Sequence, residues 1–146
     1  MEVAIISAIA VIVTAIITHR LTRKNQIKFE ERKLKETYYI QYIKALSDNI
    51  NIDDPKEAMR ILHYAHNNLL LVASTDVVNK LIYFTDMITL SGEKYYKTYN
   101  IKKNSKEYQD EYDKRLTELM IAFRYDLLGK RKNDKSYPTV KLLSIK

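Results

Sequence analysis

The chain has 146 residues with 25 Lys and Arg, 12 Tyr, two Gly, two Pro, no Cys and a formal net charge of +7. The absence of cysteine excludes a disulfide framework, a thiolate metal site and a cysteine nucleophile. So few Gly and Pro also argue against a P-loop, a dinucleotide-binding turn and the frequent turns of a β fold, so we expect an all-α protein.

The first expected element is a transmembrane helix over residues 1–21. Its segment Val3–Thr18 carries no charge. A helix over residues 3–21 is roughly 28 Å long, close to the thickness of the hydrocarbon core of a bilayer. A signal peptide is a weaker alternative because Glu2 precedes the apolar run and the basic residues follow it. A buried core helix is another, but the segment is apolar on every face.

A basic stalk over residues 22–37 follows the expected span. Residues 19–36 contain seven basic and three acidic side chains. By the positive-inside rule, this asymmetry places the N-terminus outside and the remaining chain in the cytoplasm. The expected location is therefore the cytoplasmic membrane, in a single-pass arrangement with the lipid bilayer as a partner.

Small and bulky side chains occupy opposite halves of the expected span when residues are placed at 100° intervals. The small half is the predicted homo-oligomerisation face, because small side chains let helix backbones approach closely. It comprises Ala4, Ser7, Ala8, Val11, Thr14, Ala15 and Thr18. The alternative is an isolated anchor in which residue sizes segregate by chance.

A cytoplasmic bundle of about four helices is predicted over residues 38–129, and the N-terminal helix is expected to continue into it through the stalk without a break. Asp54 and Pro55 have the spacing of an N-cap and a first helical residue. Asn104 and Glu107 form a capping-box pattern, and Gly129 ends the last helix.

Apolar residues at helical spacing predict which face of each helix enters the core. The four expected stripes are Tyr39, Ile43, Leu46 and Ile50; Ala58, Ile61, Leu62, Ala65 and Leu69; Val78, Leu81, Ile82, Thr85 and Ile88; and Tyr108, Tyr112, Leu116, Leu119, Met120, Phe123 and Leu127. A basic tail over residues 130–146 follows, and its 139–145 segment is expected either to dock as an extended strand or to stay free.

Cations and aromatic rings alternate before the last helix, a pattern that suits an anionic ligand with stacking bases. The predicted ligand-binding residues there are Lys94, Tyr95, Tyr96, Lys97, Tyr99, Lys102, Lys103 and Lys106. A second cation cluster contains Arg124, Lys130 and Arg131. The alternative is a helix whose Tyr residues cover the core while Lys faces water, and favourable interaction with a helix C-terminus also explains part of the second cluster.

Catalytic patterns are weak. His63 and His66 share a helix face, but no third ligand accompanies them at metal-site spacing. We therefore expect no enzyme, no cofactor and no metal site, with an anchored enzyme using either histidine as the less favoured alternative.

Two short segments carry a resemblance. LVASTDVVNKLI at 71–82 and AFRYDLLG at 122–129 resemble motifs of small bacterial single-span membrane proteins with a cytoplasmic helical domain, whose function is mostly unassigned. The resemblance implies an anchor joined to a bundle; an extra Leu before Gly129 departs from the pattern. Arg124 and Asp126 are two residues apart and are expected to pair with other helices rather than with each other.

The layout is also similar to that of CRISPR-associated and other antiphage membrane effectors, an architectural likeness only. We therefore expect a homo-oligomeric effector or scaffold that senses a partner or an anionic nucleotide, such as a cyclic oligonucleotide, in antiphage defence by membrane disruption. The alternative is a membrane-tethered nucleic-acid-binding protein, with nucleic acid the less favoured partner.

Overall fold

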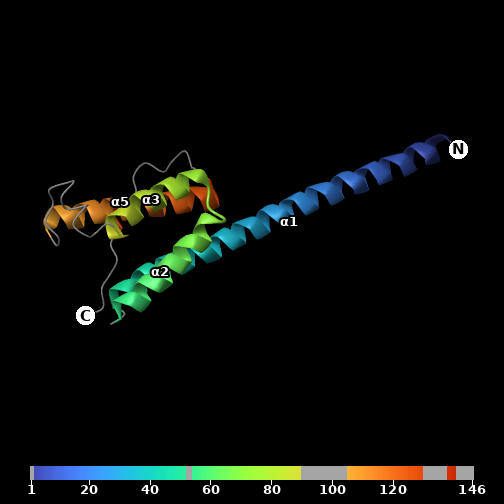
Figure 1. Cartoon of the computed structure of the whole chain (residues 1–146). Coiled ribbons are helices and arrows are strands. Elements are labelled where there is room, and N and C mark those ends of the chain that lie inside the picture. The colour runs from blue at the N-terminus through green and yellow to red at the C-terminus, as the bar shows by residue number, and fades with distance from the viewer. Residues whose placement is uncertain (1, 52–53, 90–104, 130–137, 141–146) are drawn as a thin grey trace. The chain divides into compact units, whose positions relative to one another are not determined.

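The computed structural model describes the chain apart from residues 1, 52–53, 90–104, 130–137 and 141–146 (Figure 1). Some side chains inside helices, among them those of residues 2–6 and 8–9, also lie outside the described part. The four described helices are α1 (Glu2–Asn51), α2 (Pro55–Leu70), α3 (Thr75–Thr89) and α5 (Lys106–Leu128). No described residue belongs to a strand, so the all-α prediction is confirmed for this part of the chain.

The chain divides into two compact units, Met1–Leu34 and Lys35–Lys146. The first unit holds the N-terminal part of α1, and every described side chain from Ala10 to Leu34 is exposed. The second unit holds the C-terminal part of α1 together with α2, α3 and α5.

Across the residues that the structure describes, none of the helices has a stretch both long and apolar enough to traverse a bilayer. The transmembrane helix expected over residues 1–21 therefore stays a prediction of the sequence.

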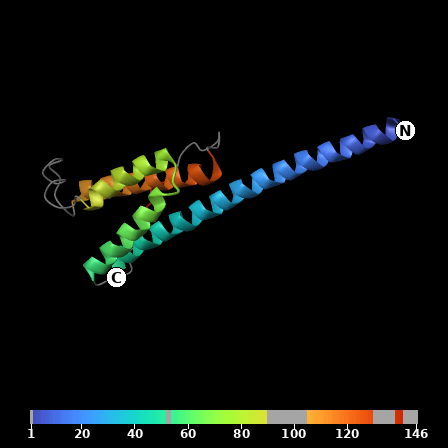
Figure 2. The ribbon, with the colours of Figure 1, turned by 45° about the vertical axis from the view of Figure 1, so that its right-hand side comes forward.

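Two helix pairs build the second unit. In both ribbon views α2 lies alongside the C-terminal part of α1, and α3 lies alongside α5 (Figures 1 and 2). The rings of Tyr39 in α1 and Phe123 in α5 stack at 4.3 Å between centroids, which joins the two pairs. The buried core takes side chains from all four helices, with Tyr42, Leu69, Leu81, Phe84 and Leu119 among the fully buried ones.

The predicted core faces agree with the structure for α2, where Ala58, Leu62, Ala65 and Leu69 are buried and Ile61 packs against them. In α1, Tyr39 and Leu46 are buried as predicted, and Tyr42 and Ala45 join them.

The face predicted for α3 is partly right, since Ile88 packs against the core, but the most deeply buried side is turned by about one position. Leu81 is buried as expected, but its buried neighbours are Val77, Phe84 and Met87, and Ile82 is 47% exposed. The apolar residues of α3 cover more than half of the helix circumference, so periodicity alone does not decide which side enters the core.

The start of α2 is confirmed. The Asp54 carboxylate accepts hydrogen bonds from the backbone N–H groups of Lys56 (2.9 Å) and Glu57 (3.5 Å), and Pro55 is the first residue of the helix.

The start of α5 differs by one residue from the predicted start. Ser105, rather than Asn104, is the N-cap, and its hydroxyl accepts a hydrogen bond from the backbone N–H of Tyr108 at 3.2 Å. Both residue types suit this position, so the sequence pattern does not discriminate between them.

One residue of the C-terminal tail is docked on the second unit. The backbone N–H of Val140 donates to the Thr117 hydroxyl at 2.8 Å, and the Val140 side chain packs against the core. The rest of the 139–145 segment, apart from Thr139, lies outside the described residues.

Gly129 ends α5 as predicted, with φ 75° and ψ 157° and its N–H bonded to the Tyr125 carbonyl at 2.9 Å. This backbone region is restricted almost entirely to glycine. A Cβ atom at this position would meet no atom within 4 Å. The need for glycine is therefore conformational rather than steric.

Gly129→Ala is expected to lower the free energy of unfolding by about 1–3 kcal/mol, because a side chain disfavours this backbone conformation. Urea denaturation of the full chain in detergent, followed by circular dichroism, measures the change. Leu128→Ala, next to it on the exposed helix end, is the control and should cost less. Wild-type stability in Gly129→Ala would contradict this account of the helix end.

Candidate functional site

A partly buried carboxylate joins α1 and α5 in the second unit. The Lys35 ammonium of α1 lies 2.8 Å from Oδ2 of Asp126 in α5, and the Tyr39 hydroxyl of α1 donates a hydrogen bond to the same oxygen. Ser74, the residue before α3, lies near enough to Asp126 to help lower the pKa of its carboxyl group. We call Lys35, Tyr39, Ser74 and Asp126 the Asp126 cluster.

Local structure positions each member of the cluster. Lys35 and Tyr39 are one helical turn apart, so both side chains reach the same point of α5. The Tyr39 ring is held by its stack on Phe123, one turn before Asp126. Ser74 precedes the first turn of α3, where its carbonyl accepts a hydrogen bond from the N–H of Val78 at 2.9 Å.

The electrostatics of the cluster favour the ionised carboxylate. Burial raises the pKa of Asp126, but hydrogen bonds from Lys35, Tyr39 and Ser74 and the Lys35 charge outweigh this effect, so its pKa is lowered. Burial and the neighbouring Asp126 carboxylate raise the pKa of Tyr39 well above its usual range. At neutral pH the cluster is an ammonium–carboxylate pair with a neutral phenol, which fits a structural junction better than an acid–base centre.

The two segments that carry the family resemblance meet in this cluster, since Ser74 belongs to the first and Asp126 to the second. The expectation that Asp126 pairs with another helix is confirmed by its contacts with α1. The residues of α1 that complete the cluster were not singled out from the sequence, because Lys35 looks like one of many stalk cations and Tyr39 like a core residue.

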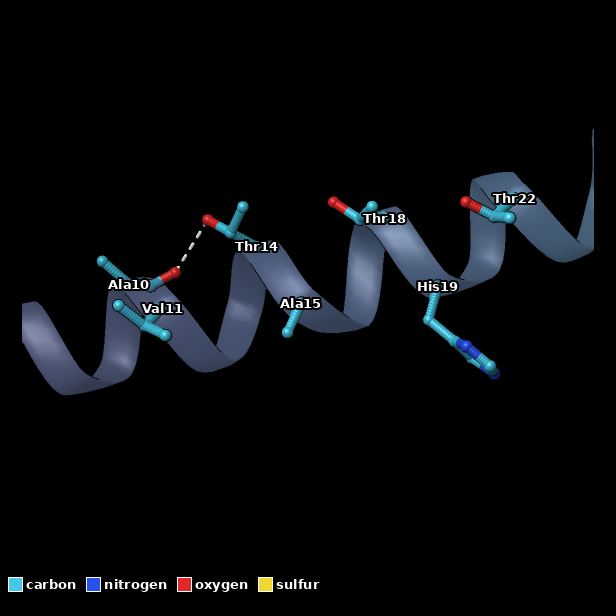
Figure 3. Close-up of a pocket in the computed structure, with 7 residues that line it drawn as sticks. All are labelled: Ala10, Val11, Thr14, Ala15, Thr18, His19 and Thr22. Atoms are coloured by element: carbon cyan, nitrogen blue, oxygen red, sulfur yellow. Dashed lines mark hydrogen bonds between the residues drawn. The ribbon is translucent and has the colours of Figure 1, made fainter.

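The described part of the predicted oligomerisation face lies along one side of α1. Val11, Thr14, Ala15 and Thr18 line a shallow surface groove with Ala10, His19 and Thr22 (Figure 3). Ser7 is exposed as well, whereas the side chains of Ala4 and Ala8 lie outside the described residues. The Thr14 hydroxyl donates to the Ala10 carbonyl at 2.8 Å, so its proton is already used within the helix.

Most of the predicted ligand-binding residues lie outside the described part of the chain: Lys94, Tyr95, Tyr96, Lys97, Tyr99, Lys102, Lys103, Lys130 and Arg131. Lys106 is exposed in the first turn of α5, and Arg124 is half-buried near its end and already engaged within the protein. Eighteen residues of helix place them about 27 Å apart along the axis. The structure therefore does not bring these two cations into one site.

The two histidines of α2 differ in surroundings. His63 is exposed, whereas His66 is half-buried with its Nδ1 3.3 Å from the Thr85 hydroxyl. Burial, followed by the nearby His63, lowers the pKa of His66. Within the described residues no three His, Cys, Asp or Glu side chains form a group suited to a metal ion.

A second buried polar contact was missed from the sequence. Arg115, only 4% exposed, lies with its guanidinium 3.7 Å from the Tyr83 ring centroid. It donates to Glu111 at 2.7 Å and to the Tyr83 carbonyl at 2.8 Å. Because each of these donors has a partner, the arrangement stabilises the α3–α5 pair and offers no open binding group.

No protein-family model, curated protein or solved structure matches this chain.

Asp126→Asn is expected to lower the free energy of unfolding at pH 7 by about 1–3 kcal/mol, because Lys35 loses its charged partner. The folded-state pKa of Asp126 is lowered. Its contribution is therefore present above the ordinary aspartate pKa of about 4 and is lost as the pH falls through the lower folded-state value. The difference from wild type should shrink below pH 4.

Denaturation of the full chain at several pH values tests this prediction. Asp110→Asn, an exposed change on the same helix, is the matched control and should have little effect. A loss equal to that of the control, or one that persists unchanged at low pH, would show that the ion pair does not stabilise the fold.

Proposed function

We propose that the protein is a single-span, membrane-anchored homo-oligomer whose cytoplasmic helical bundle acts as an effector or scaffold. The observation that carries the proposal is the uncovered apolar surface in the first half of α1. Val11 is 68% exposed, Ile17 is 53% exposed and Leu21 is 56% exposed.

This surface favours an apolar environment. Burying one large aliphatic side chain contributes about 1.5–3 kcal/mol. Six such side chains are about half or more exposed in this stretch: Val11, Ile12, Val13, Ile16, Ile17 and Leu21. Five of them belong to the uncharged run Val3–Thr18, and Leu21 lies three residues beyond it, after His19 and Arg20. A bilayer is the occupant that covers all sides of such a helix at once, which supports the membrane anchor.

Charge supports the orientation. The basic residues after the apolar run attract anionic headgroups of the inner leaflet by about 1 kcal/mol each when close to the surface. The N-terminus is then outside and the second unit in the cytoplasm.

The small-residue face supports assembly. Ala15 and Thr18 let a second helix approach closely, and in lipid such packing replaces the hydrophobic effect as the driving force. Because the Thr14 proton is already bonded to Ala10, the contact depends on close packing more than on a hydrogen bond donated by Thr14.

The effector part of the proposal rests on the continuity of α1. The same helix carries the exposed apolar residues and, further along, Lys35 and Tyr39 of the Asp126 cluster. A ligand or partner that shifts the bundle would act on α1 through these contacts, repack the anchor and disturb the bilayer. An anionic nucleotide as ligand rests on the Lys and Tyr pattern of residues 94–106, and a role in antiphage defence rests on the layout alone.

The membrane anchor predicts a charge effect. Ile12→Lys with Ile16→Lys should move the expressed protein from the membrane fraction to the supernatant, since each Lys near a span centre costs about 2.5–3.5 kcal/mol. Fractionation before and after alkaline extraction measures the change. Ile12→Leu with Ile16→Leu should stay in the membrane. Wild-type protein that needs no detergent would rule the anchor out.

The oligomerisation face predicts a size effect. Ala8→Ile with Ala15→Ile should reduce the assembly to smaller species, because the added methylene groups hold the backbones apart. Light scattering of the detergent-solubilised protein gives the mass. Ile9→Leu with Ile16→Leu, on the bulky side, is the control. An unchanged mass in the Ala variant would remove the basis for this contact.

A further inference from the structure

The C-terminal tail returns to the bundle at Val140. The backbone N–H of Val140 donates to the Thr117 hydroxyl of α5 at 2.8 Å, and its side chain packs against the buried core. Pro138 and Thr139, the two described residues before it, are exposed and belong to no helix or strand. Within the described part of the tail, Val140 is therefore the residue that enters the bundle.

The Thr117 hydroxyl is suited to hold this N–H. Inside α5 it donates its proton to the Asp113 carbonyl at 2.6 Å. A hydroxyl has a single proton, so this bond leaves the oxygen lone pairs for a donor from outside the helix. The carbonyls in the middle of a helix are already used by the helix itself, so a side chain has to supply the acceptor. Thr117 does so for Val140.

The contact is small enough to open. Among the described residues it comprises one hydrogen bond, the half-buried Val140 and the exposed Thr139 beside it. The net contribution of one hydrogen bond is modest, and ordering each residue of a chain end costs a similar amount of free energy. Segments with so few buried contacts open locally while the core stays folded. The size of the contact thus implies a docked and a released state.

Charge favours the docked state. Thr139 lies at a recess of α5 that is lined by three carboxylates, one ammonium and the Thr117 hydroxyl: Asp110, Asp113, Glu118, Lys114 and Thr117. The tail over residues 130–146 carries six basic side chains and one acidic one, and Lys141 directly follows Val140. Opposite charges at a surface attract each other less as salt is added, with a screening length of about 10 Å at 0.1 M. Docking is therefore expected to weaken at high ionic strength.

We propose that Thr139 and Val140 form a releasable latch on α5, which the Thr117 hydroxyl holds closed and which opens when charge attraction is screened. The open latch frees the basic tail and uncovers the part of the core that Val140 contacts. All of these residues belong to the second unit. The latch is thus independent of the membrane anchor and of the assembly proposed above.

Single cysteines report the opening, because the chain has none of its own. Full-length Thr139→Cys, Val140→Cys and Ala122→Cys chains are treated in detergent with a maleimide, and the labelling rates are compared. Thr139 is exposed, whereas Ala122 is 4% exposed in the core. Thr139→Cys should react fastest, Val140→Cys several-fold more slowly, and Ala122→Cys slowest of all, since it reacts only when the bundle unfolds.

Both ends of this order are decisive. If Val140→Cys reacts as fast as Thr139→Cys, the tail is not docked and the latch does not exist. If Val140→Cys reacts as slowly as Ala122→Cys, the tail does not open before the core unfolds, and the contact is a fixed part of the fold.

The role of Thr117 is tested in the Val140→Cys chain. Thr117→Val keeps the shape of the side chain but removes the acceptor, and should raise the labelling rate about fivefold, the factor that corresponds to one typical hydrogen bond. Thr117→Ser keeps the hydroxyl and should label like its parent. Slow labelling of Ala122→Cys in a Thr117→Val chain is the check that the core stays folded. Equal rates in the Thr117→Val and Thr117→Ser chains would refute the hydroxyl as the holding group.

Ionic strength gives a second readout that needs no further substitution. Raising the NaCl concentration from about 0.05 M to about 0.5 M should speed the labelling of Val140→Cys about twofold or more, because the charges are screened. Thr139→Cys, whose side chain is exposed, is the control for effects of salt on the reagent. A Val140→Cys rate that changes no more than that of the control would show that charge does not hold the latch.

Discussion

The carboxylate of Asp126 is the constraint on which the arrangement of the second unit depends. An ion pair exposed on a protein surface contributes little to the free energy of folding. The Asp126 side chain, however, is only 11% exposed, and it has both Lys35 and Tyr39 as donors. Removing it from water is unfavourable unless those donors are in place. The position of α5 is therefore tied to the position of α1 by a polar contact as well as by the stack of Tyr39 on Phe123.

Much of the fold could be predicted from the sequence, because its signals are local. The Asp54–Pro55 start of α2 and the Gly129 end of α5 each depend on one or two residues with a narrow conformational preference. The face of α2 was predictable because its apolar stripe is narrow. The face of α3 was not, since nearly every side of that helix offers an apolar residue and only packing against α5 selects Val77 and Phe84.

The polar contacts were less predictable. Lys35 and Arg115 each lie in a highly charged segment, where a cation normally faces water. Their partners lie 91 and 32 residues away, Asp126 for Lys35 and the Tyr83 carbonyl for Arg115, so no local pattern marks them. Asp126 was the exception, because its position relative to Arg124 indicated a partner on another helix. The residues 94–103 of the predicted ligand-binding pattern lie outside the described residues, so this ligand site stays a prediction.

The order of the helices along the chain has a consequence for biosynthesis. Core residues Leu119 and Phe123 and the Asp126 carboxylate all belong to α5, the last helix described. The side chains of α1 and α2 that face them are made much earlier, and synthesis proceeds at about 5–20 residues per second. The core of the second unit therefore cannot be completed until α5 has been synthesised.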